Sequence, residues 1–155
     1  MTAATRRTTA ALSATLVLAT FTVLAQQSPG RWDTEKYAKL PQPAEEYTPV
    51  QVNDKLYLIG GNAAVLTPGA RPTHPARVMV YDLANNTWTE KKNTPFFADH
   101  MSAATANGKI YVFGGSGGMT QEAPSGTLDN AWEYDPAGDS WKAITKLNSK
   151  RTAGS

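Results

Sequence analysis

The feature that most constrains the fold of this chain is an internal repeat with a period of about 53 residues. Lys55–Gly61 (KLYLIGG) recurs 54 residues later as Lys109–Gly115 (KIYVFGG). A tyrosine that precedes a tryptophan by seven residues also occurs in both copies. These pairs are Tyr81 with Trp88, and Tyr134 with Trp141. Ordered matches at a near-constant offset indicate one structural unit that the chain forms twice.

Each unit divides into four short predicted strands. The second strand is the apolar run before Gly-Gly, whose β-branched and aromatic residues lack helical spacing and fit a strand buried on both faces. Turn-forming pairs, Asn53-Asp54 and Asn107-Gly108, precede it and tolerate the positive φ of a tight hairpin. The predicted first strands are Tyr47–Val52 and Met101–Ala106, the third are Arg77–Tyr81 and Asn130–Tyr134, and the fourth begin at Trp88 and Trp141. Four consecutive antiparallel strands make one meander sheet, and such sheets repeated every ~50 residues are propeller blades.

Four hydrophobic residues, Gly-Gly, a Tyr-Asp pair and a later tryptophan form a pattern that resembles the kelch repeat. The resemblance covers residues 32–155. It implies an all-β fold, a kelch-type β-propeller of four-stranded antiparallel blades. Two blades are expected at 45–93 and 99–147. We expect the glycines to permit close backbone approach, and the tyrosines and tryptophans to pack between blades, so all of them are assigned structural roles.

Both ends of the repeat region resemble partial units. Residues 31–41 resemble a fourth strand alone, which we expect to close the ring by joining the last blade. Residues 148–155 resemble the start of a third blade. Kelch propellers typically have six or seven blades, about 300–350 residues at this period. The chain is therefore expected to be a fragment of a longer propeller whose remaining blades are missing.

The N-terminus predicts a cleavable signal peptide at residues 1–25. Arg6 and Arg7 precede the apolar run Ala11–Leu24, and Val23–Ala25 offers a cleavage site. As a helix this run rises only about 21 Å, whereas a bilayer core is roughly 30 Å thick. We therefore expect no membrane span in the mature chain and a periplasmic or secreted location.

Composition narrows the partner classes. Without Arg6 and Arg7, 13 of the 15 basic residues remain, which equals the 13 acidic residues. A neutral mature chain lacks the basic field that nucleic-acid binding needs. The chain has no cysteine, and His74 and His100 show no ligand spacing. The sequence therefore predicts no nucleic acid, no metal site and no cofactor.

The topology predicts where a binding site would lie. In a meander, the loops after the second strands and the links between blades share one end, and these loops are long here, at Asn62–Ala76 and Ser116–Leu128. Binding sites are often built from such loops, although unconstrained length variation explains them equally well. The inner strands begin at the same end with charged residues in near-equivalent positions of three successive units. The candidate binding residues are Glu45, Glu46, Asp99, His100 and Arg151.

These side chains fit a polar channel mouth that binds sugar hydroxyls or carboxylates, with His100 as a proton carrier. They also fit a solvated rim with local ion pairs. The sequence favours an exported module that binds a glycan or a protein partner through the long-loop end, and it assigns no catalytic residue. The resemblance offers two enzymatic alternatives, a periplasmic sugar epimerase similar to sialic-acid mutarotases and a galactose-oxidase-like sugar oxidase, although the oxidase's cysteine and copper ligands are not identifiable here.

The signal peptide is directly testable. When the chain is expressed in a Gram-negative host, the protein recovered outside the cytoplasm should begin at Gln26, because the peptidase site follows Ala25. N-terminal sequencing of the exported protein measures this. Exported protein that retains Met1 would exclude a cleavable signal.

Overall fold

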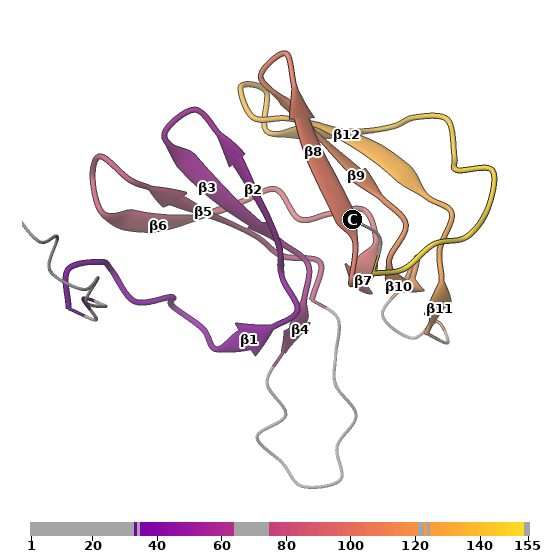
Figure 1. Cartoon of the computed structure of the whole chain (residues 1–155), viewed down its shortest axis with the longest axis horizontal. Coiled ribbons are helices and arrows are strands. Elements are labelled where there is room, and N and C mark those ends of the chain that lie inside the picture. The colour runs from indigo at the N-terminus through magenta and orange to yellow at the C-terminus, as the bar shows by residue number, and fades with distance from the viewer. Residues whose placement is uncertain (1–32, 34, 64–74, 121–122, 124, 154–155) are drawn as a thin grey trace, which may run out of the picture. The chain divides into compact units, whose positions relative to one another are not determined.

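Hairpin turns and short apolar runs give this chain a fold of strands alone within its described residues. The computed structural model describes residues 33, 35–63, 75–120, 123 and 125–153, which are coloured by position in Figure 1. The predicted signal peptide lies outside these residues. All strands belong to the unit Thr34–Ser155. In the part that the structure describes, no helix has the length and apolar character needed to cross a membrane.

Each repeat folds into one four-stranded antiparallel meander, as the sequence predicted (Figure 1). The first sheet contains β2 (Thr48–Val52), β3 (Lys55–Ile59), β5 (Val78–Asp82) and β6 (Thr87–Lys91), in that order. The second sheet contains β8 (Ser102–Ala106), β9 (Lys109–Phe113), β12 (Ala131–Asp135) and β13 (Ser140–Ala143), in that order. The predicted boundaries are about one residue out, which is the usual uncertainty at strand ends.

The turn after each third strand explains the Tyr-Asp pair. The Asp82 carboxylate accepts hydrogen bonds from the backbone N–H groups of Ala84 and Asn85, each at 3.0 Å. Asp135 repeats this role in the second sheet, with bonds from Ala137 and Gly138. An aspartate that accepts from backbone groups two and three residues later fixes a tight turn. The aspartate of each pair therefore sets the path into the fourth strand.

The long loops contain strands that the sequence did not predict. β4 (Asn62–Ala63) begins the first loop and pairs with β1 (Ala44–Glu45). In the second loop, β10 (Ser116–Gly118) pairs with β7 (Phe97–Asp99) and β11 (Gly126–Thr127). The prediction that 116–128 is loop throughout was therefore wrong. Glycine has low intrinsic strand propensity, but here its missing side chain permits the close pairing, because a Cβ on Gly117 would collide with the Phe97 carbonyl oxygen.

The hydrophobic core lies between the two sheets. The first sheet contributes Tyr57, Ile59, Val78 and Val80, and the second contributes Ile110, Val112 and Tyr134, all at most 3% exposed. The rings of Tyr57 and Tyr134 meet edge to face with centroids 6.1 Å apart. Burial of these apolar side chains is the main stabilising term, at roughly 1.5–3 kcal/mol for each aliphatic residue. The repeats are therefore packed face to face, as neighbouring blades are.

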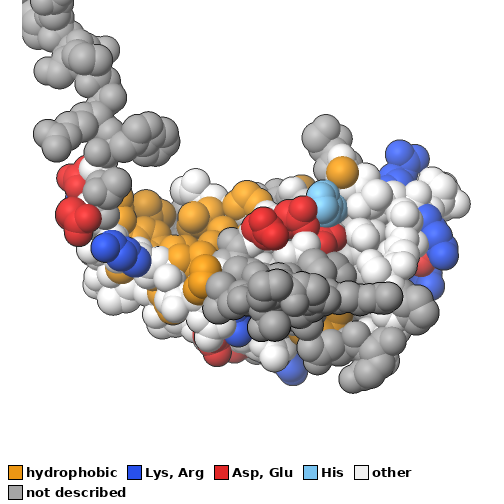
Figure 2. Space-filling view, turned by 90° about the horizontal axis from the view of Figure 1, so that it is seen from below, with side chains coloured by type: hydrophobic (Ala, Val, Ile, Leu, Met, Phe, Trp, Pro, Cys, Tyr) orange, Lys and Arg blue, Asp and Glu red, His pale blue; other side chains and the backbone are white. Residues whose placement is uncertain are grey.

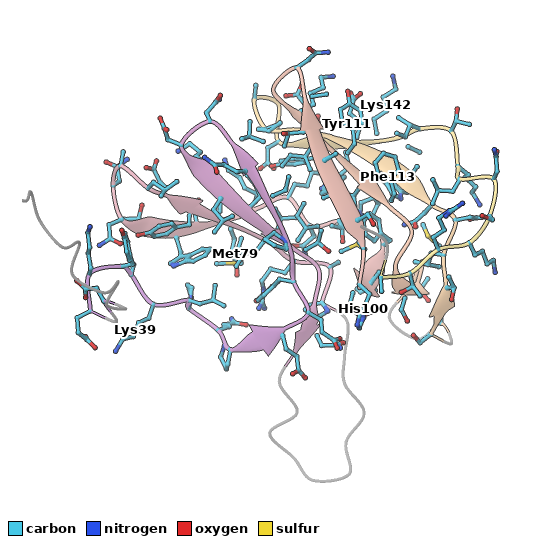
Figure 3. The ribbon with its side chains drawn as sticks, in the orientation of Figure 1. Lys39, Met79, His100, Tyr111, Phe113 and Lys142 are labelled. Atoms are coloured by element: carbon cyan, nitrogen blue, oxygen red, sulfur yellow. The ribbon has the colours of Figure 1, made fainter. Side chains whose placement is uncertain are left out.

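The outer face of the second sheet is more exposed than the equivalent face of the first sheet, which packs against the second sheet. Tyr111 and Phe113 occupy the repeat positions of Tyr57 and Ile59 but are only partly buried (Figure 3). The same two sequence positions are thus buried in the sheet that packs against a following sheet, and only partly buried in the sheet after which the described residues form no further one.

A hydrogen-bonded clamp joins the second sheet to the link that leaves the first. The indole N–H of Trp141 donates to the carbonyl oxygen of Lys92 at 3.1 Å. The backbone N–H of Lys92 donates to Asp139 Oδ1 at 2.9 Å, and the Tyr134 hydroxyl donates to the same oxygen at 2.6 Å. The Tyr134 and Trp141 rings pack with centroids 4.8 Å apart. We call this arrangement the tyrosine–tryptophan clamp, and it holds both polar backbone groups of one link residue.

The first sheet forms the same clamp around Ala38. Trp88 donates to the Ala38 carbonyl at 2.9 Å, and the Ala38 N–H donates to Asn86 Oδ1 at 2.6 Å. The Tyr81 hydroxyl bonds to that Asn86 oxygen as well. Ala38 is therefore equivalent to Lys92, the residue directly after a fourth strand. In the segment 31–41, which was predicted to be a lone fourth strand, Ala38 thus makes the contacts that Lys92 makes after β6.

Residues 33 and 35–41 nevertheless form no strand in this chain. A strand needs a neighbour for its backbone groups, and the described residues of the chain provide none for this segment. That the segment joins a last blade stays a prediction.

Glycine substitutions should separate backbone strain from steric collision. Gly114 has a φ of +61°, and a Cβ there would collide with the Arg151 carbonyl oxygen, whereas Gly108 has a φ of +74° in open space. Gly126 has neither constraint. In urea unfolding followed by tryptophan fluorescence, Gly108→Ala should cost about 1 kcal/mol, Gly114→Ala at least ~2 kcal/mol, and Gly126→Ala close to nothing. Equal losses at Gly108 and Gly114 would contradict the close approach.

The clamp should tolerate amide but not methyl at position 139. Asp139→Ala removes the acceptor for Tyr134 and Lys92 and should lower the free energy of unfolding by about 2 kcal/mol. Asp139→Asn should cost less than ~1 kcal/mol, because Asn86 performs the same role in the first sheet. Equal losses in the two variants would contradict the clamp.

The same pair of variants has a pH signature. The hydrogen bond from Tyr134, followed by that from the Lys92 backbone, lowers the pKa of Asp139. A lowered folded-state pKa adds stability above the unfolded value of about 3.9, and this stability is lost as pH falls through the folded value. Stability of Asp139→Asn should therefore fall less steeply below about pH 4 than that of the unmodified chain.

Candidate functional site

The links and the long loops meet at one end of the sheets, as the topology predicted. Glu45 of β1 pairs with Asn62 at the head of the first loop. Asp99 of β7 pairs with Ser116 at the head of the second. The starts of the inner strands therefore lie beside the starts of the long loops. We call this end, with its residues 44–46, 62, 98–100 and 151–153, the long-loop face.

The chain enters each inner strand through a residue in the left-handed conformation. Glu46 has a φ of 60°, and its repeat counterparts His100 and Ala153 both have a φ of 49°. This conformation is uncommon for residues other than glycine, so the surrounding links must hold it in place. The buried hydroxyl of Thr48, the first residue of β2, donates to the Met101 carbonyl at 3.2 Å and joins the start of β2 to the link that enters β8.

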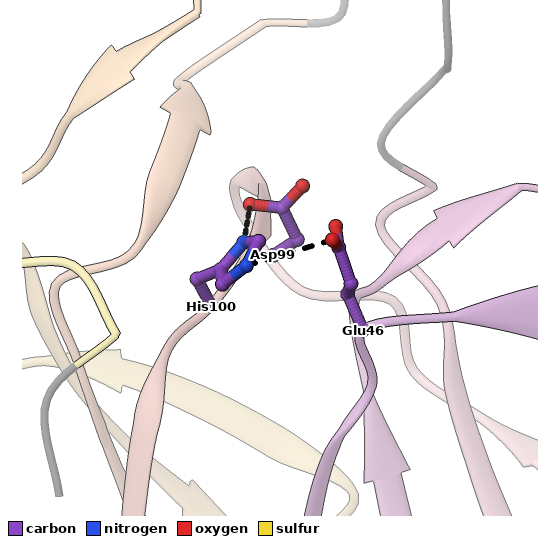
Figure 4. A group of neighbouring side chains, drawn as sticks. All are labelled: Glu46, Asp99 and His100. Atoms are coloured by element: carbon purple, nitrogen blue, oxygen red, sulfur yellow. Dashed lines mark hydrogen bonds and ion pairs between the residues drawn. The ribbon is translucent and has the colours of Figure 1, made fainter.

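This backbone geometry brings three of the predicted site residues together. Glu46 and His100 point toward one another from neighbouring links, and Asp99 lies beside the imidazole (Figure 4). Asp99 Oδ1 lies 2.9 Å from His100 Nδ1, and Glu46 Oε1 lies 3.5 Å from His100 Nε2. The imidazole is thus placed between two carboxylates, one contributed by each repeat unit.

The three side chains of the cluster differ in burial. The side chain of Asp99 is 5% exposed, whereas those of His100 and Glu46 are 43% and 36% exposed. The hydrogen bond with Asp99 raises the pKa of His100, and the negative charges of Asp99 and Glu46 raise it further. At the surface, the histidine lies beside acidic side chains (Figure 2). The carboxylate of Asp99 is buried behind the accessible His100 and Glu46.

Asn62 is a member of this site that the sequence analysis missed. Its side-chain amide donates from Nδ2 to Glu46 Oε2. The residue is only 7% exposed, and its Oδ1 has no hydrogen-bond partner among the described residues. Its position directly after Gly60-Gly61, at the head of a long loop, was the available signal. No local motif marks Asn62, because its contact with Glu46 spans 16 residues of sequence.

The predicted site residues are only partly brought together. Glu46, Asp99 and His100 form the cluster, and Glu45 is exposed in the preceding position of β1. Arg151 is exposed at the long-loop face, and its backbone pairs with Leu128. Figure 3 shows His100 beside the start of β8, well away from Tyr111 on the outer face of the second sheet.

The register predicted for Arg151 is one residue out. The N–H of Gly61 donates to the Ala98 carbonyl at 3.1 Å, and that of Gly115 donates to the Arg151 carbonyl at 2.8 Å. Arg151 is therefore the counterpart of Ala98, and Thr152 is the counterpart of Asp99. Backbone hydrogen bonds fix this register, so side-chain types in the links carry little information about it.

A groove lies at the opposite end, among the hairpin turns. It has a volume of about 560 Å³ and is lined by Val52, Lys55 and Asp82 of the first sheet and by Gly108 and Pro136 of the second. The hydrogen bond from Lys55 lowers the pKa of Asp82 to about 2, so this rim is held as an ion pair. None of its described lining residues is a histidine, and the groove lies at the end of the short turns and not at that of the long loops.

Comparisons with known proteins find relatives with the same repeat. The family model described as "Kelch motif" matches residues 45–95 and 99–148. Kelch-like protein terF of Aspergillus terreus is 29% identical over 130 residues, which are 82% of this chain and 28% of that protein. Kelch repeat and BTB domain-containing protein 12 of Danio rerio is 31% identical over 109 residues, covering 68% of this chain and 18% of its own length.

A solved structure shows the same fold. The structure of YjhT superposes with a TM-score of 0.59 at 21% identity, over 75% of this chain and 32% of that one. The chain thus spans less than a third of the length of each of these proteins.

Proposed function

We propose that this chain, which belongs to the kelch-repeat family of β-propellers, is part of a module that binds a protein partner through its long-loop face. Kelch repeats generally mediate protein interaction, and several relatives carry the name "Kelch repeat and BTB domain-containing protein". The residues that define the family are used in packing here, so the binding surface must come from other positions.

The observation that carries the proposal is the cluster of Glu46, Asp99 and His100. Glu46 and His100 are accessible, and neither belongs to the hydrophobic core or to the clamp. Together with Glu45, the face presents two accessible carboxylates beside His100 and Arg151, and the Asp99 carboxylate lies buried behind them. Such a surface is complementary to lysine or arginine side chains of a partner, and electrostatic complementarity of this kind mainly governs specificity and association rate.

We extend the proposal to the location of the module. The charged start, the apolar run of limited length and the small residues at Val23–Ala25 support export of the mature chain. A module outside the cytoplasm would meet glycans as well as proteins, and the polar face is chemically suited to sugar hydroxyls. The experiment below distinguishes these two partner classes.

Site-specific photo-cross-linking tests which end binds. A photoreactive phenylalanine analogue at Glu46 or Arg151 should form adducts in the native host at least ten-fold more efficiently than the same analogue at Asp54 or Asn107. All four positions are exposed, but the last two lie in the hairpin turns at the other end. Adducts are measured by gel shift and mass spectrometry.

Two results would contradict the proposal. Equal adduct yields from both ends would mean that the long-loop face is not the binding surface. An adduct whose mass disappears on glycosidase treatment would identify a glycan partner in place of a protein.

A further inference from the structure

We propose that His100 and Glu46 bind a divalent transition-metal ion of the zinc class, with Asp99 as the carboxylate that orients the histidine. The site lies between the two repeats on the long-loop face. It does not depend on the proposed partner, because all the protein groups come from this chain. It departs from the sequence-based expectation of no metal site, since its residues are far apart in sequence and show no ligand spacing.

The first argument is the tautomer of His100. The carboxylate of Asp99, which is almost fully buried, accepts the Nδ1–H at 2.9 Å. In the neutral imidazole, the lone pair then resides on Nε2, which faces Glu46. A carboxylate that fixes a histidine through one ring nitrogen so that the other can bind a metal is the usual arrangement around protein-bound zinc.

The second argument is the separation of the two donor atoms. His100 Nε2 and Glu46 Oε1 are 3.5 Å apart. That is long for a hydrogen bond between charged groups, which is roughly 2.7–2.9 Å. Two ligands bound to one tetrahedral ion at about 2.0–2.1 Å are separated by roughly 3.3–3.4 Å. The observed spacing therefore fits a shared cation better than a shared proton.

The third argument does not rest on the distance between the two donor atoms and comes from Asn62. This side chain is more than nine-tenths buried and is directed at Glu46 by its Nδ2 hydrogen bond. Its Oδ1 is buried without a partner in the part of the chain that the structure describes. Buried polar atoms in proteins are normally paired, often by ordered water. A water bound to the metal beside Glu46 would donate to this oxygen.

The position of the site also gives the ion a structural effect. Glu46 precedes β2 and His100 precedes β8, so an ion bound by both joins the entry points of the inner strands of the two sheets. One donor atom from each of Glu46, Asp99 and His100 lies within 4.8 Å of the others. Because the folded chain assembles these groups and the unfolded chain does not, bound metal should stabilise the fold.

Cobalt titration of the tag-free 155-residue chain, after treatment with a chelator, tests the site. Co²⁺ should give visible d–d absorption that Zn²⁺ displaces, and Zn²⁺ should raise the melting temperature. His100→Gln and Glu46→Gln should each weaken Co²⁺ binding at least ten-fold. Both side chains are accessible, so these variants should fold, which far-ultraviolet circular dichroism checks.

Two controls match these variants. Glu45→Gln removes the same charge one residue away and should leave Co²⁺ affinity unchanged. His74→Gln removes the other histidine of the chain and should also have no effect. Absence of d–d absorption and of a melting shift in the unmodified chain, or equal affinity in all four variants, would overturn the proposal.

Asp99→Asn tests the positioning role. It should weaken Co²⁺ binding by roughly 10–100-fold, as loss of an orienting carboxylate does at zinc sites. At saturating Co²⁺ its absorption bands should keep their positions, because both direct ligands remain. Unchanged affinity would exclude the role of Asp99. If this variant does not fold, the His100 and Glu46 variants still decide the site.

Discussion

The structure depends on the tyrosine–tryptophan clamp, which fixes both backbone groups of a single link residue. Asp139 accepts from the Lys92 N–H and the Tyr134 hydroxyl, while Trp141 donates to the Lys92 carbonyl. The backbone N–H and carbonyl of Lys92 lie in the link between the two sheets, where neither group has a hydrogen-bond partner within a sheet. Lys92 is exposed, so each of these hydrogen bonds contributes only about 0.5–1.5 kcal/mol. Their main effect is to align neighbouring sheets.

Backbone hydrogen bonds of the Gly-Gly pairs connect neighbouring units at the long-loop face. The first glycine of each Gly-Gly pair donates to a residue in its own unit, and the second donates to the link that enters the next unit. Gly60 bonds to Arg77 and Gly61 to Ala98, and the second repeat does the same with Asn130 and Arg151. The left-handed backbone of these glycines and the close carbonyl oxygens leave no room for a Cβ. The repeat thus needs the glycine pair because the backbone of a neighbouring segment passes close to it. It needs the tyrosine and tryptophan because they form the clamp.

The tyrosine–tryptophan clamp and the Gly-Gly pairs explain why the sequence predicted so much of the fold. Each requires particular residue types at fixed offsets, so it appears as a motif in both repeats, and the four strands between the motifs follow. β10 was missed because Ser116–Gly118 is rich in glycine, and its strand geometry arises from pairing with β7 and not from local propensity. The register of Arg151 was missed because backbone bonds, which any side chain allows, determine it.

The candidate site follows from the same reasoning applied to positions that the repeat leaves free. The motif requires a left-handed residue before each inner strand, but it places no demand on that residue's side chain, and the three positions hold Glu46, His100 and Ala153. Consecutive links lie side by side, so two such positions 54 residues apart place their side chains within contact distance. The candidate site is therefore assembled between repeats. Glu46 and His100 are too far apart in sequence to form a recognisable ligand motif. The repeat offset that predicts the sheets nevertheless pairs these two residues.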